Sequence, residues 1–404
     1  MMELLRSLRI RSFAFLWTGQ TVSRLGDSLY RIALAWWVLE KTGSAAAMGT
    51  VLIFSFLPML LFLLIGGIAV DRLPRGRVML ASDVLRGAIV AFVAALAFAQ
   101  TLEIWHVYAA SMLFGFVDAF FQPAYTAIVP EIVPADALPS ANSLTNLSRQ
   151  ITGVAGPMLG AAIVALGGTP AAFALDAVSF FVSAACLLPI IGLLGMRTAE
   201  VKSSSALNDL REGLATVFGS PWLWLTIAIF ALANVAMDGP VAVSLPFLVK
   251  DALHADVDAL GLLYSSSSLG AIAGAVWLGR FQRIRRRGLV MYGAGVVSAI
   301  AVLLAGLPIP IAAICVVFFF EGWSVATFGL VWTNTLQELV PGDRLGRVSS
   351  IDMLGSYVLL PIGYGMTGWL TDAIGAPMVF VLGGGIGALL IALGLLHPAI
   401  RGLD

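Results

Sequence analysis

Three charged residues lie close together inside the first apolar stretch of the sequence: Arg24, Asp27 and Arg31. In a helix, spacings of three and four residues place all three side chains on one face, over about two turns. A carboxylic acid in apolar surroundings can take up and release a proton, or it can pair with a cation. The two arginines can equally neutralise Asp27, and the three side chains then form a polar stripe that packs against neighbouring helices. The spacing alone leaves both interpretations open.

Single acidic residues also occur near the middle of three other apolar stretches. They are Asp118, Asp238 and Glu321. With Asp27, they place one acid in each of the first, fourth, seventh and tenth stretches. Because a lone charge in hydrocarbon is costly, it is retained for function or for pairing. We expect these four acids, with Arg31, to bind a substrate or protons, whereas Asp176 and Asp352 lie nearer the ends of their stretches and are expected to pair locally.

The residues needed for common enzyme chemistry are scattered along the chain. Both cysteines lie inside apolar stretches, and the three histidines lie singly near stretch ends; they are Cys186, Cys315, His106, His254 and His397. This spacing predicts neither a metal site nor a nucleophile with a neighbouring base. We therefore expect no enzyme activity, no metal, no cofactor and no nucleic-acid partner.

The composition places these residues in a membrane protein. Of the 404 residues, 59% are hydrophobic and 11% are charged, whereas soluble proteins carry roughly 25% charged residues. A helix needs about 20 apolar residues to cross the hydrocarbon core. Twelve such stretches occur, at about 12–39, 45–70, 78–99, 104–128, 143–167, 171–194, 220–249, 259–279, 288–307, 310–334, 347–371 and 377–397. We expect an all-α integral membrane protein with twelve transmembrane helices.

The distribution of Lys and Arg predicts which side of the membrane each loop faces. If the N-terminus is cytosolic, 17 of the 23 basic residues fall on the cytosolic side, and only Lys41 and Lys250 fall on the opposite side. Cytosolic loops of membrane proteins are enriched in Lys and Arg. We therefore expect a multi-pass protein of the cytoplasmic (inner) membrane with both termini in the cytosol.

The sequence repeats itself at a constant offset of 207 residues. Residues 131–138 (Glu-Ile-Val-Pro-Ala-Asp-Ala-Leu) align with 338–345 (Glu-Leu-Val-Pro-Gly-Asp-Arg-Leu). Further pairs at this offset are Gly115 with Gly322, Gly156 with Gly363, and Gly168 with Gly375. Such repeats build membrane proteins from two similar halves. We expect two pseudo-symmetric six-helix bundles around a central cavity, at 1–195 and 220–404, joined by a cytosolic linker at 196–219 that contains an interfacial helix.

Two glycine-containing segments stand out by the spacing of their glycine, proline and charged residues. The first, in the loop between the second and third stretches, contains Gly67, Asp71, Arg72, Arg75 and Arg77. The second, in the fifth stretch, contains Gly153, Gly156, Pro157 and Gly160. Proline bends a helix and glycines let a partner helix approach closely. The second segment is therefore either a hinge between the two halves or a site of tight packing, and its spacing does not decide between them.

With these residues assembled, the sequence resembles the major facilitator superfamily of transporters. The loop matches the family pattern G-x-x-x-D-R-x-x-R-x-R, and the fifth stretch resembles the antiporter signature G-P-x-x-G-G, with Ala161 in place of the last glycine. Asp27 followed by residues 33–36 (Ala-Leu-Ala-Trp), and Asp83 with Arg86, resemble the subgroup that contains the enterobactin exporter and the macrolide efflux proteins. The resemblance extends over essentially the whole chain.

The resemblance implies a conformational latch in the loop. Asp71 would sit at the N-terminus of the eleventh helix, where a carboxylate satisfies free N–H groups and the helix dipole. Arg75 would hold a carboxylate, for which Glu131 is the nearest candidate. These contacts would form when the cytosolic side is closed. Many drug–proton antiporters carry an arginine in the middle of the fourth helix, where this sequence offers Asp118 instead.

The resemblance, together with the acids inside the apolar stretches, predicts a secondary active transporter that works by alternating access. We expect it to export an amphipathic small molecule, drug-like or siderophore-like, in exchange for protons, with the proton gradient as its energy source. We also expect it to function as a monomer among membrane lipids. The alternative is a lipid or lysophospholipid carrier of the same fold.

Overall fold

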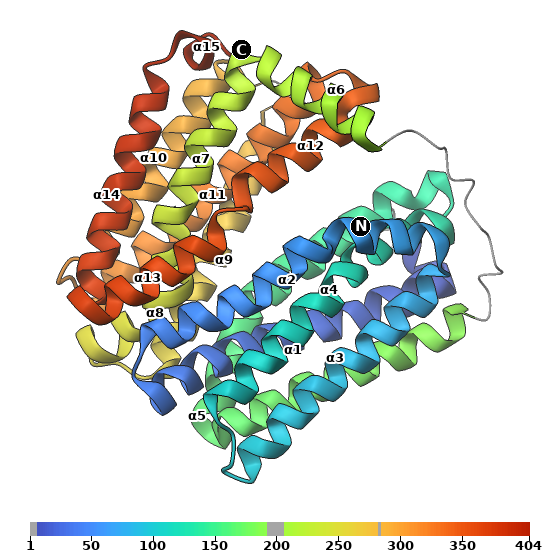
Figure 1. The fold of residues 1–404 in the computed structure, drawn as a ribbon, viewed down its shortest axis with the longest axis vertical. Coiled ribbons are helices and arrows are strands. Elements are labelled where there is room, and N and C mark those ends of the chain that lie inside the picture. The colour runs from blue at the N-terminus through green and yellow to red at the C-terminus, as the bar shows by residue number, and fades with distance from the viewer. Residues whose placement is uncertain (1–5, 192–205, 282–283) are drawn as a thin grey trace. The chain divides into compact units, whose positions relative to one another are not determined.

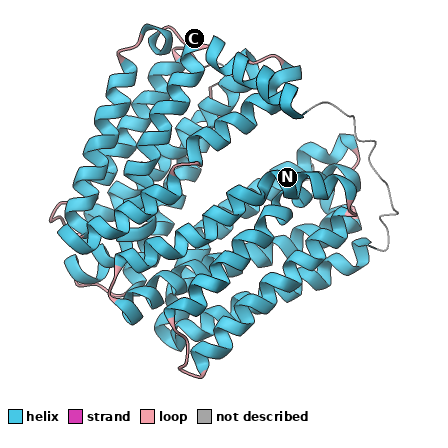
Figure 2. Ribbon diagram, in the orientation of Figure 1, coloured by secondary structure: helices cyan, strands magenta, loops and turns pink. Residues whose placement is uncertain are grey.

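Helices make up most of the described chain. The computed structural model describes residues 6–191, 206–281 and 284–404, and these ranges contain no strand (Figures 1 and 2). The predicted all-α class is therefore confirmed. The first part of the predicted linker, 196–205, lies outside the described residues.

The chain divides into two compact units. Unit 1 comprises Met1–Gly43 and Thr50–Val201, and unit 2 comprises Ser44–Gly49 and Lys202–Asp404. The main division thus falls within the predicted linker. The short segment Ser44–Gly49 also belongs to unit 2, although it lies more than a hundred residues before this division.

The long helices of unit 1 correspond to the first six apolar stretches. Their bounds are α1 (Arg11–Thr42), α2 (Ala45–Arg72), α3 (Arg75–Phe98), α4 (Ile104–Ile132) and α5 (Leu138–Ile191), with 3₁₀ turns η1 (Arg6–Arg9) and η2 (Ala135–Ala137) before α1 and α5. Helix α5 packs against α1 and α3, and α3 packs against α4. Gly168 interrupts α5 with φ 74° and ψ 172°, a conformation that glycine adopts without steric cost. The kink separates the fifth stretch from the sixth.

Unit 2 contains more but shorter helices. Their bounds are α6 (Ala206–Gly219), α7 (Pro221–Gly239), α8 (Leu245–Phe247), α9 (Val257–Leu278), α10 (Arg287–Ala305), α11 (Ile311–Leu339), α12 (Gly342–Tyr357), α13 (Leu360–Ile374), α14 (Ala376–Leu395) and α15 (Pro398–Arg401), with π-helical turns η3 (Pro240–Ser244) and η4 (Leu248–Ala252) on either side of α8. Helix α11 packs against α9 and α10, and α14 packs against α10 and α7. Helix α6 lies within the predicted linker, and its Glu212 accepts a charged hydrogen bond from Arg347 of α12.

Nine helical segments in the described ranges are long and apolar enough to cross a membrane. One of them, Ala135–Ile191, contains the fifth predicted stretch and the described part of the sixth. Helix α1 has 32 residues but carries the three charges described above, and the eleventh stretch is divided between α12 and α13, of 16 and 15 residues. The chain is therefore a multi-pass membrane protein, and the count of twelve spans stays a prediction.

Glycines related by the sequence repeat make the same contacts in the two units. A Cβ atom on Gly115 of α4 would lie 1.9 Å from the carbonyl oxygen of Ser55, and one on Gly322 of α11 would lie 1.8 Å from that of Ser267. Both distances are far below van der Waals contact, so only glycine fits at either position. The repeat in the sequence therefore corresponds to a repeat in helix packing.

The predicted hinge segment lies inside the first half of α5. A Cβ atom on Gly156 would come 2.4 Å from the Cβ of Ser28, and one on Gly160 would come 3.1 Å from the Cα of Leu29. Helical geometry continues through Gly153, Gly156, Pro157 and Gly160. These contacts support close packing of α5 on α1, and a hinge role for the segment stays a prediction.

Candidate functional site

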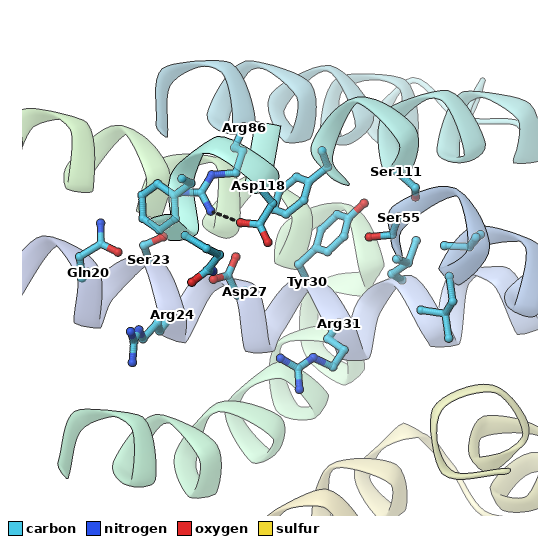
Figure 3. A pocket seen from close by; sticks show the side chains of 16 residues that line it. Gln20, Ser23, Arg24, Asp27, Tyr30, Arg31, Ser55, Arg86, Ser111 and Asp118 are labelled. Carbon is cyan, nitrogen blue, oxygen red and sulfur yellow. Dashed lines mark hydrogen bonds and ion pairs between the residues drawn. The ribbon is translucent and has the colours of Figure 1, made fainter. Parts of the chain in front are cut away.

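A cavity of about 300 Å³ lies inside unit 1, lined by side chains of α1, α2, α3 and α4 (Figure 3). Its polar lining residues are Gln20, Ser23, Arg24, Asp27, Tyr30, Arg31, Ser55, Arg86, Ser111, Asp118 and Gln122. Three of the predicted site residues, Asp27, Arg31 and Asp118, thus line one cavity, although Asp118 is distant from the other two in sequence.

Arg86 of α3 is the cation that the acids of this cavity share. Its Nη2 donates a hydrogen bond to Asp83 Oδ1 at 2.5 Å. Its Nη1 donates to Asp118 Oδ1 at 3.4 Å, the interaction drawn as a dashed line in Figure 3. Arg86 exposes 3% of its surface and Asp83 exposes none. Because removing an ion from water costs several kcal/mol, a buried charge requires partners of this kind. Asp83 and Asp118 therefore compensate the guanidinium inside the helical unit.

Neighbouring helices fix the orientation of this ion pair. Ser183 of α5 donates to Asp83 Oδ2 at 2.7 Å, and Gln20 of α1 donates to Ser183 Oγ at 2.9 Å. The guanidinium carbon of Arg86 lies 3.8 Å from the ring centroid of Phe121, within the range of a cation–π interaction. Four helices of unit 1 thus contribute to holding the cluster in place.

Asp27 of α1 is the third carboxylate of the cluster. It points toward Arg86 and Asp118, whereas Arg24 and Arg31 point away from them (Figure 3). Among the described residues, Asp27 accepts no hydrogen bond and makes no ion pair with either arginine of its own helix. The charge of Arg86 acts on it nonetheless, as does that of Arg31. Direct ion pairs of the kind expected for a self-neutralised stripe are thus absent among the described residues, and Asp27 is the acid of the cluster that accepts no hydrogen bond.

Asp176 lies beside this cluster, in the part of α5 that follows the kink at Gly168. It is fully buried in the second half of α5, where Ser179 donates to its Oδ1 at 3.3 Å. A Cβ atom on Gly26, next to Asp27, would come 2.5 Å from the same oxygen. The expected local pairing of Asp176 is thus present, through Ser179. Its proximity to α1 could not be expected from its position in the sequence.

The two predicted acids of unit 2 are held by neutral donors. Tyr364 of α13 donates to Asp238 Oδ2 at 2.9 Å, and Ser267 of α9 donates to Glu321 Oε2 at 2.7 Å. The charge of Asp238 also acts on Glu321, so the two acids lie within electrostatic range. Neither is paired with a basic residue in the described ranges, in contrast to Asp83 and Asp118 of unit 1.

The predicted latch is described in part. Arg75 Nη1 donates to Glu131 Oε1 at 2.5 Å and to the carbonyl oxygen of Ala127 at 3.1 Å, which joins the start of α3 to the end of α4. Gly67 and Arg72 lie in the last turns of α2, and Arg77 lies in the first turn of α3. The side chain of Asp71 lies outside the described residues.

An equivalent ion pair occurs in unit 2. Arg287 Nη2, at the start of α10, donates to Glu338 Oε2 at 2.5 Å, near the end of α11. Glu338 is the repeat partner of Glu131 at the offset of 207, so the pair corresponds to that of Arg75. The loop before α10 thus retains the arginine contact of the latch.

The first turn of α2 is held by a carboxylate of α13. Asp372 accepts hydrogen bonds from the backbone N–H of Ala45 at 2.6 Å, from that of Ala46 at 3.1 Å and from Ser44 Oγ at 2.6 Å. The first N–H groups of a helix have no partner within the helix, and they favour a negative charge. These bonds explain why Ser44–Gly49 belongs to unit 2.

A second cavity, of about 370 Å³, lies inside unit 2. It is lined by residues of α7, α10, α11, α12 and α14, among them Phe230, Asn234, Ser298, Ser324, Phe328, Trp332, Asp352 and Tyr357. Asp352 accepts a hydrogen bond from Trp332 Nε1 at 2.9 Å and from Ser356 Oγ at 3.4 Å. The expected local pairing of Asp352 is thus observed, although both donors are neutral.

The fold is that of major facilitator superfamily transporters. The structure superimposes with a TM-score of 0.74 on an inward-facing bacterial homologue of the iron transporter ferroportin, at 16% identity and covering 95% of this chain and 98% of that one. It superimposes with the same TM-score on a POT family transporter, at 13% identity and covering 96% of both chains. Identities this low show a common fold and nothing of the substrate.

The sequence comparison defines the family more narrowly. Residues 4–401 match the family described as transmembrane secretion effectors, and the chain belongs to it. It is 24% identical over 395 residues to macrolide efflux protein A of Streptococcus pyogenes, with 96% of both chains covered. It is 27% identical over 391 residues to the multidrug efflux pump Tap of Mycolicibacterium fortuitum, covering 94% of both chains, and 26% identical over 382 residues to the enterobactin exporter EntS of Citrobacter koseri, covering 94% and 86%.

Proposed function

We propose that this efflux transporter exchanges protons for an amphipathic small molecule, drug-like or siderophore-like, by alternating access between the two sides of the cytoplasmic membrane. The observation that carries the proposal is the cluster of Asp27, Asp83 and Asp118 around the single guanidinium of Arg86.

The charge of this cluster supports a proton site. With all three acids ionised, the cluster holds three negative charges around the one guanidinium of Arg86, and Arg24 and Arg31, which also line the cavity, point away from it (Figure 3). Such an excess is unfavourable in a low-dielectric interior, so binding of a proton relieves it. Asp83 and Asp118 already bind Arg86, which leaves Asp27 as the acid that takes up and releases the proton. A proton that enters at Asp27 then drives the exit of a substrate molecule, because the two are bound in turn.

A latch on the cytosolic side is part of the alternating access that we propose. The pairs Arg75–Glu131 and Arg287–Glu338 each join two helices at their ends within one unit, and each is expected on the cytosolic side. We propose that Asp71 completes a latch that stabilises the state closed to the cytosol. Asp71→Asn would then favour the inward-open state and slow turnover while leaving substrate binding nearly unchanged, and an equally large loss of binding would contradict this role.

Efflux into inside-out membrane vesicles tests the proposal. The vesicles are energised with a proton gradient and given a panel of compounds that includes a macrolide. We expect uptake of at least one compound, and collapse of the gradient by a protonophore should abolish it. Uptake that is indifferent to the protonophore would rule out proton coupling, and uptake confined to labelled phospholipid would favour a lipid carrier.

Four variants locate the coupling site. They are Asp27→Asn, Asp118→Asn, Asp238→Asn and Glu321→Gln. We expect Asp27→Asn to reduce gradient-driven uptake by at least about tenfold, because an ionisable group inside the membrane is the carrier. Asp251→Asn is the matched control, since Asp251 is exposed in η4. Full coupled activity of all four variants would show that the site is elsewhere.

A further inference from the structure

The cavity of unit 2 lies at the position that corresponds to the charged cavity of unit 1. Equivalent contacts define the correspondence: Gly156 with Ser28 repeats as Gly363 with Val235, which gives an offset of 207 for α1 and α7. For α3 and α10 the offset is 212, because Arg287 occupies the place of Arg75 in the ion pairs described above.

At these offsets, every charge of the unit 1 cluster is lost in unit 2. Asp27 corresponds to Asn234, Asp83 to Gly295, Arg86 to Ser298 and Asp118 to Val325, and all four replacements line the second cavity. The second cavity is therefore not a second copy of the proton site. Its position among the helices related by the repeat is retained while the lining chemistry has changed, so we expect a different occupant.

Asp352 supplies the one charge among the described residues that line this cavity. Its two hydrogen-bond donors, Trp332 and Ser356, are both neutral. In unit 1, by contrast, three arginines line the cavity along with the acids. A carboxylate without a basic neighbour inside a helical unit is best compensated by a cation that comes from outside.

Aromatic rings form the wall next to this carboxylate. The ring centroids of Phe230 and Phe328 lie 4.1 Å apart, and Phe328 is stacked on Trp332 at 6.4 Å and an interplanar angle of 13°. Aromatic faces attract ammonium groups and bury apolar surface at the same time. The wall therefore suits a ligand that is both cationic and apolar.

Ser324 adds a second polar contact that the protein itself does not use. Its side chain is fully buried and lines the cavity, and its Oγ has no hydrogen-bond partner. A buried hydroxyl without a partner is costly, so a ligand that supplies a polar atom would be favoured. This hydroxyl and the Asp352 carboxylate, on α11 and α12, lie on the surface of the same cavity.

We propose that the cavity of unit 2 is the binding site for the substrate, and that the substrate is a monocationic amphiphile. Its ammonium group pairs with Asp352, its apolar body lies on Phe230 and Phe328, and a polar group reaches Ser324. The inference rests on the proposed function in one respect, that the bound molecule is the one exported. In this proposal the two units bind different species: protons bind in unit 1, and the organic cation binds in unit 2.

Ligand titration of the purified full-length protein in a non-ionic detergent tests the inference without any gradient. The probes are benzyltrimethylammonium and phenylmethanesulfonate, which have similar shapes and opposite charges, and binding is followed by saturation-transfer NMR. We expect the wild-type protein to bind the cation at least about tenfold more tightly than the anion, since only the cation pairs with Asp352. Equal binding of the two probes, or tighter binding of the anion, would overturn the inference.

Variants then place the bound cation. Asp352→Asn should weaken binding of benzyltrimethylammonium by about tenfold, because the amide keeps an acceptor for Trp332 but loses the charge. Asp251→Asn, in the same unit and away from the cavity, should bind the cation as the wild type does. An Asp352→Asn protein that elutes as the wild type and binds the cation equally well would overturn the inference.

The outcome is separable from that of the efflux experiment. Charge-selective binding that depends on Asp352, in a protein that exports nothing in vesicles, would support this site and contradict the proposed function. Proton-coupled export that is unaffected by Asp352→Asn would support the proposed function and contradict the substrate site in unit 2.

Discussion

In unit 1 the guanidinium of Arg86 lies where unit 2 has the hydroxyl of Ser298, while Gly115 and Gly322, which the repeat relates, make the same contact in both units. Gly115 and Gly322 each approach a serine carbonyl oxygen too closely for any side chain. Helix packing and the chemistry of the cavities therefore vary independently between the two units. Packing of the helices is repeated, whereas the charges that line the two cavities are not.

The largest expected effect distinguishes the two cavities by stability. Arg86→Ala leaves buried carboxylates without their cation, and it should lower the free energy of unfolding by about 3–5 kcal/mol. Ser298→Ala, at the corresponding position, should lower it by less than about 1 kcal/mol. Unfolding by SDS titration in detergent micelles measures both. Similar losses for the two variants would mean that the cavities are alike in electrostatics.

A second pair of variants tests the common packing. Gly115→Ala and Gly322→Ala should each destabilise the protein by about 1–3 kcal/mol, because the new methyl group overlaps a carbonyl oxygen. Gly293→Ala is the control, since a Cβ there meets no atom within 4 Å and alanine favours a helix by about 1 kcal/mol. A loss in only one of the two units would break the correspondence between them.

The hydrogen bonds from the start of α2 to Asp372 belong neither to the two cavities nor to the repeated glycine contacts. Asp372→Ala should cost about 1 kcal/mol, the usual effect of losing a helix N-cap. Hydrogen exchange at Ala45 and Ala46 should increase at the same time, because their N–H groups lose the acceptor. Unchanged exchange at these two residues would show that the cap contributes nothing.

The smallest expected effect concerns the two ion pairs at the helix ends. Glu131→Gln and Glu338→Gln should each cost about 1 kcal/mol or less, because glutamine keeps an acceptor for the arginine and both glutamates are partly exposed, so that water and salt screen the lost charge. The loss should shrink further as the salt concentration rises. A large loss of stability that does not depend on salt, in either variant, would contradict the expected screening of that ion pair by solvent.

Much of the fold follows from the sequence alone. Apolar stretches predict the helices because their backbone groups must be satisfied inside the membrane, and the offset of 207 predicts the repeated glycine contacts. The division of the eleventh stretch into α12 and α13 could not be expected, because hydropathy does not register a break inside an apolar run. The attachment of Ser44–Gly49 to unit 2 also depends on Asp372, which is far away in the sequence.

The candidate site follows from the sequence only in part. Asp27 and Asp118 are recognisable as acids in apolar stretches, and they do line one cavity. Arg86, the ion-pair partner of Asp118, lies in α3, 32 residues away, and no spacing rule connects the two. The spacing of Arg24 and Arg31 around Asp27 fits a functional acid and a neutralised stripe equally, and only the structure shows that the two arginine side chains point away from the cluster (Figure 3). A signal was present in Asp83 and Arg86, three residues apart, which a helix brings onto one face.

Proton binding at Asp27 is the central step of the proposed mechanism, and measuring proton movement during transport tests this step directly. Proteoliposomes with an enclosed pH-sensitive dye are given a compound that the wild-type protein exports, first with and then without a proton gradient. We predict that wild-type protein moves protons against the compound, whereas Asp27→Asn still exchanges labelled for unlabelled compound but moves no protons. Proton movement by Asp27→Asn at the wild-type rate would contradict the account.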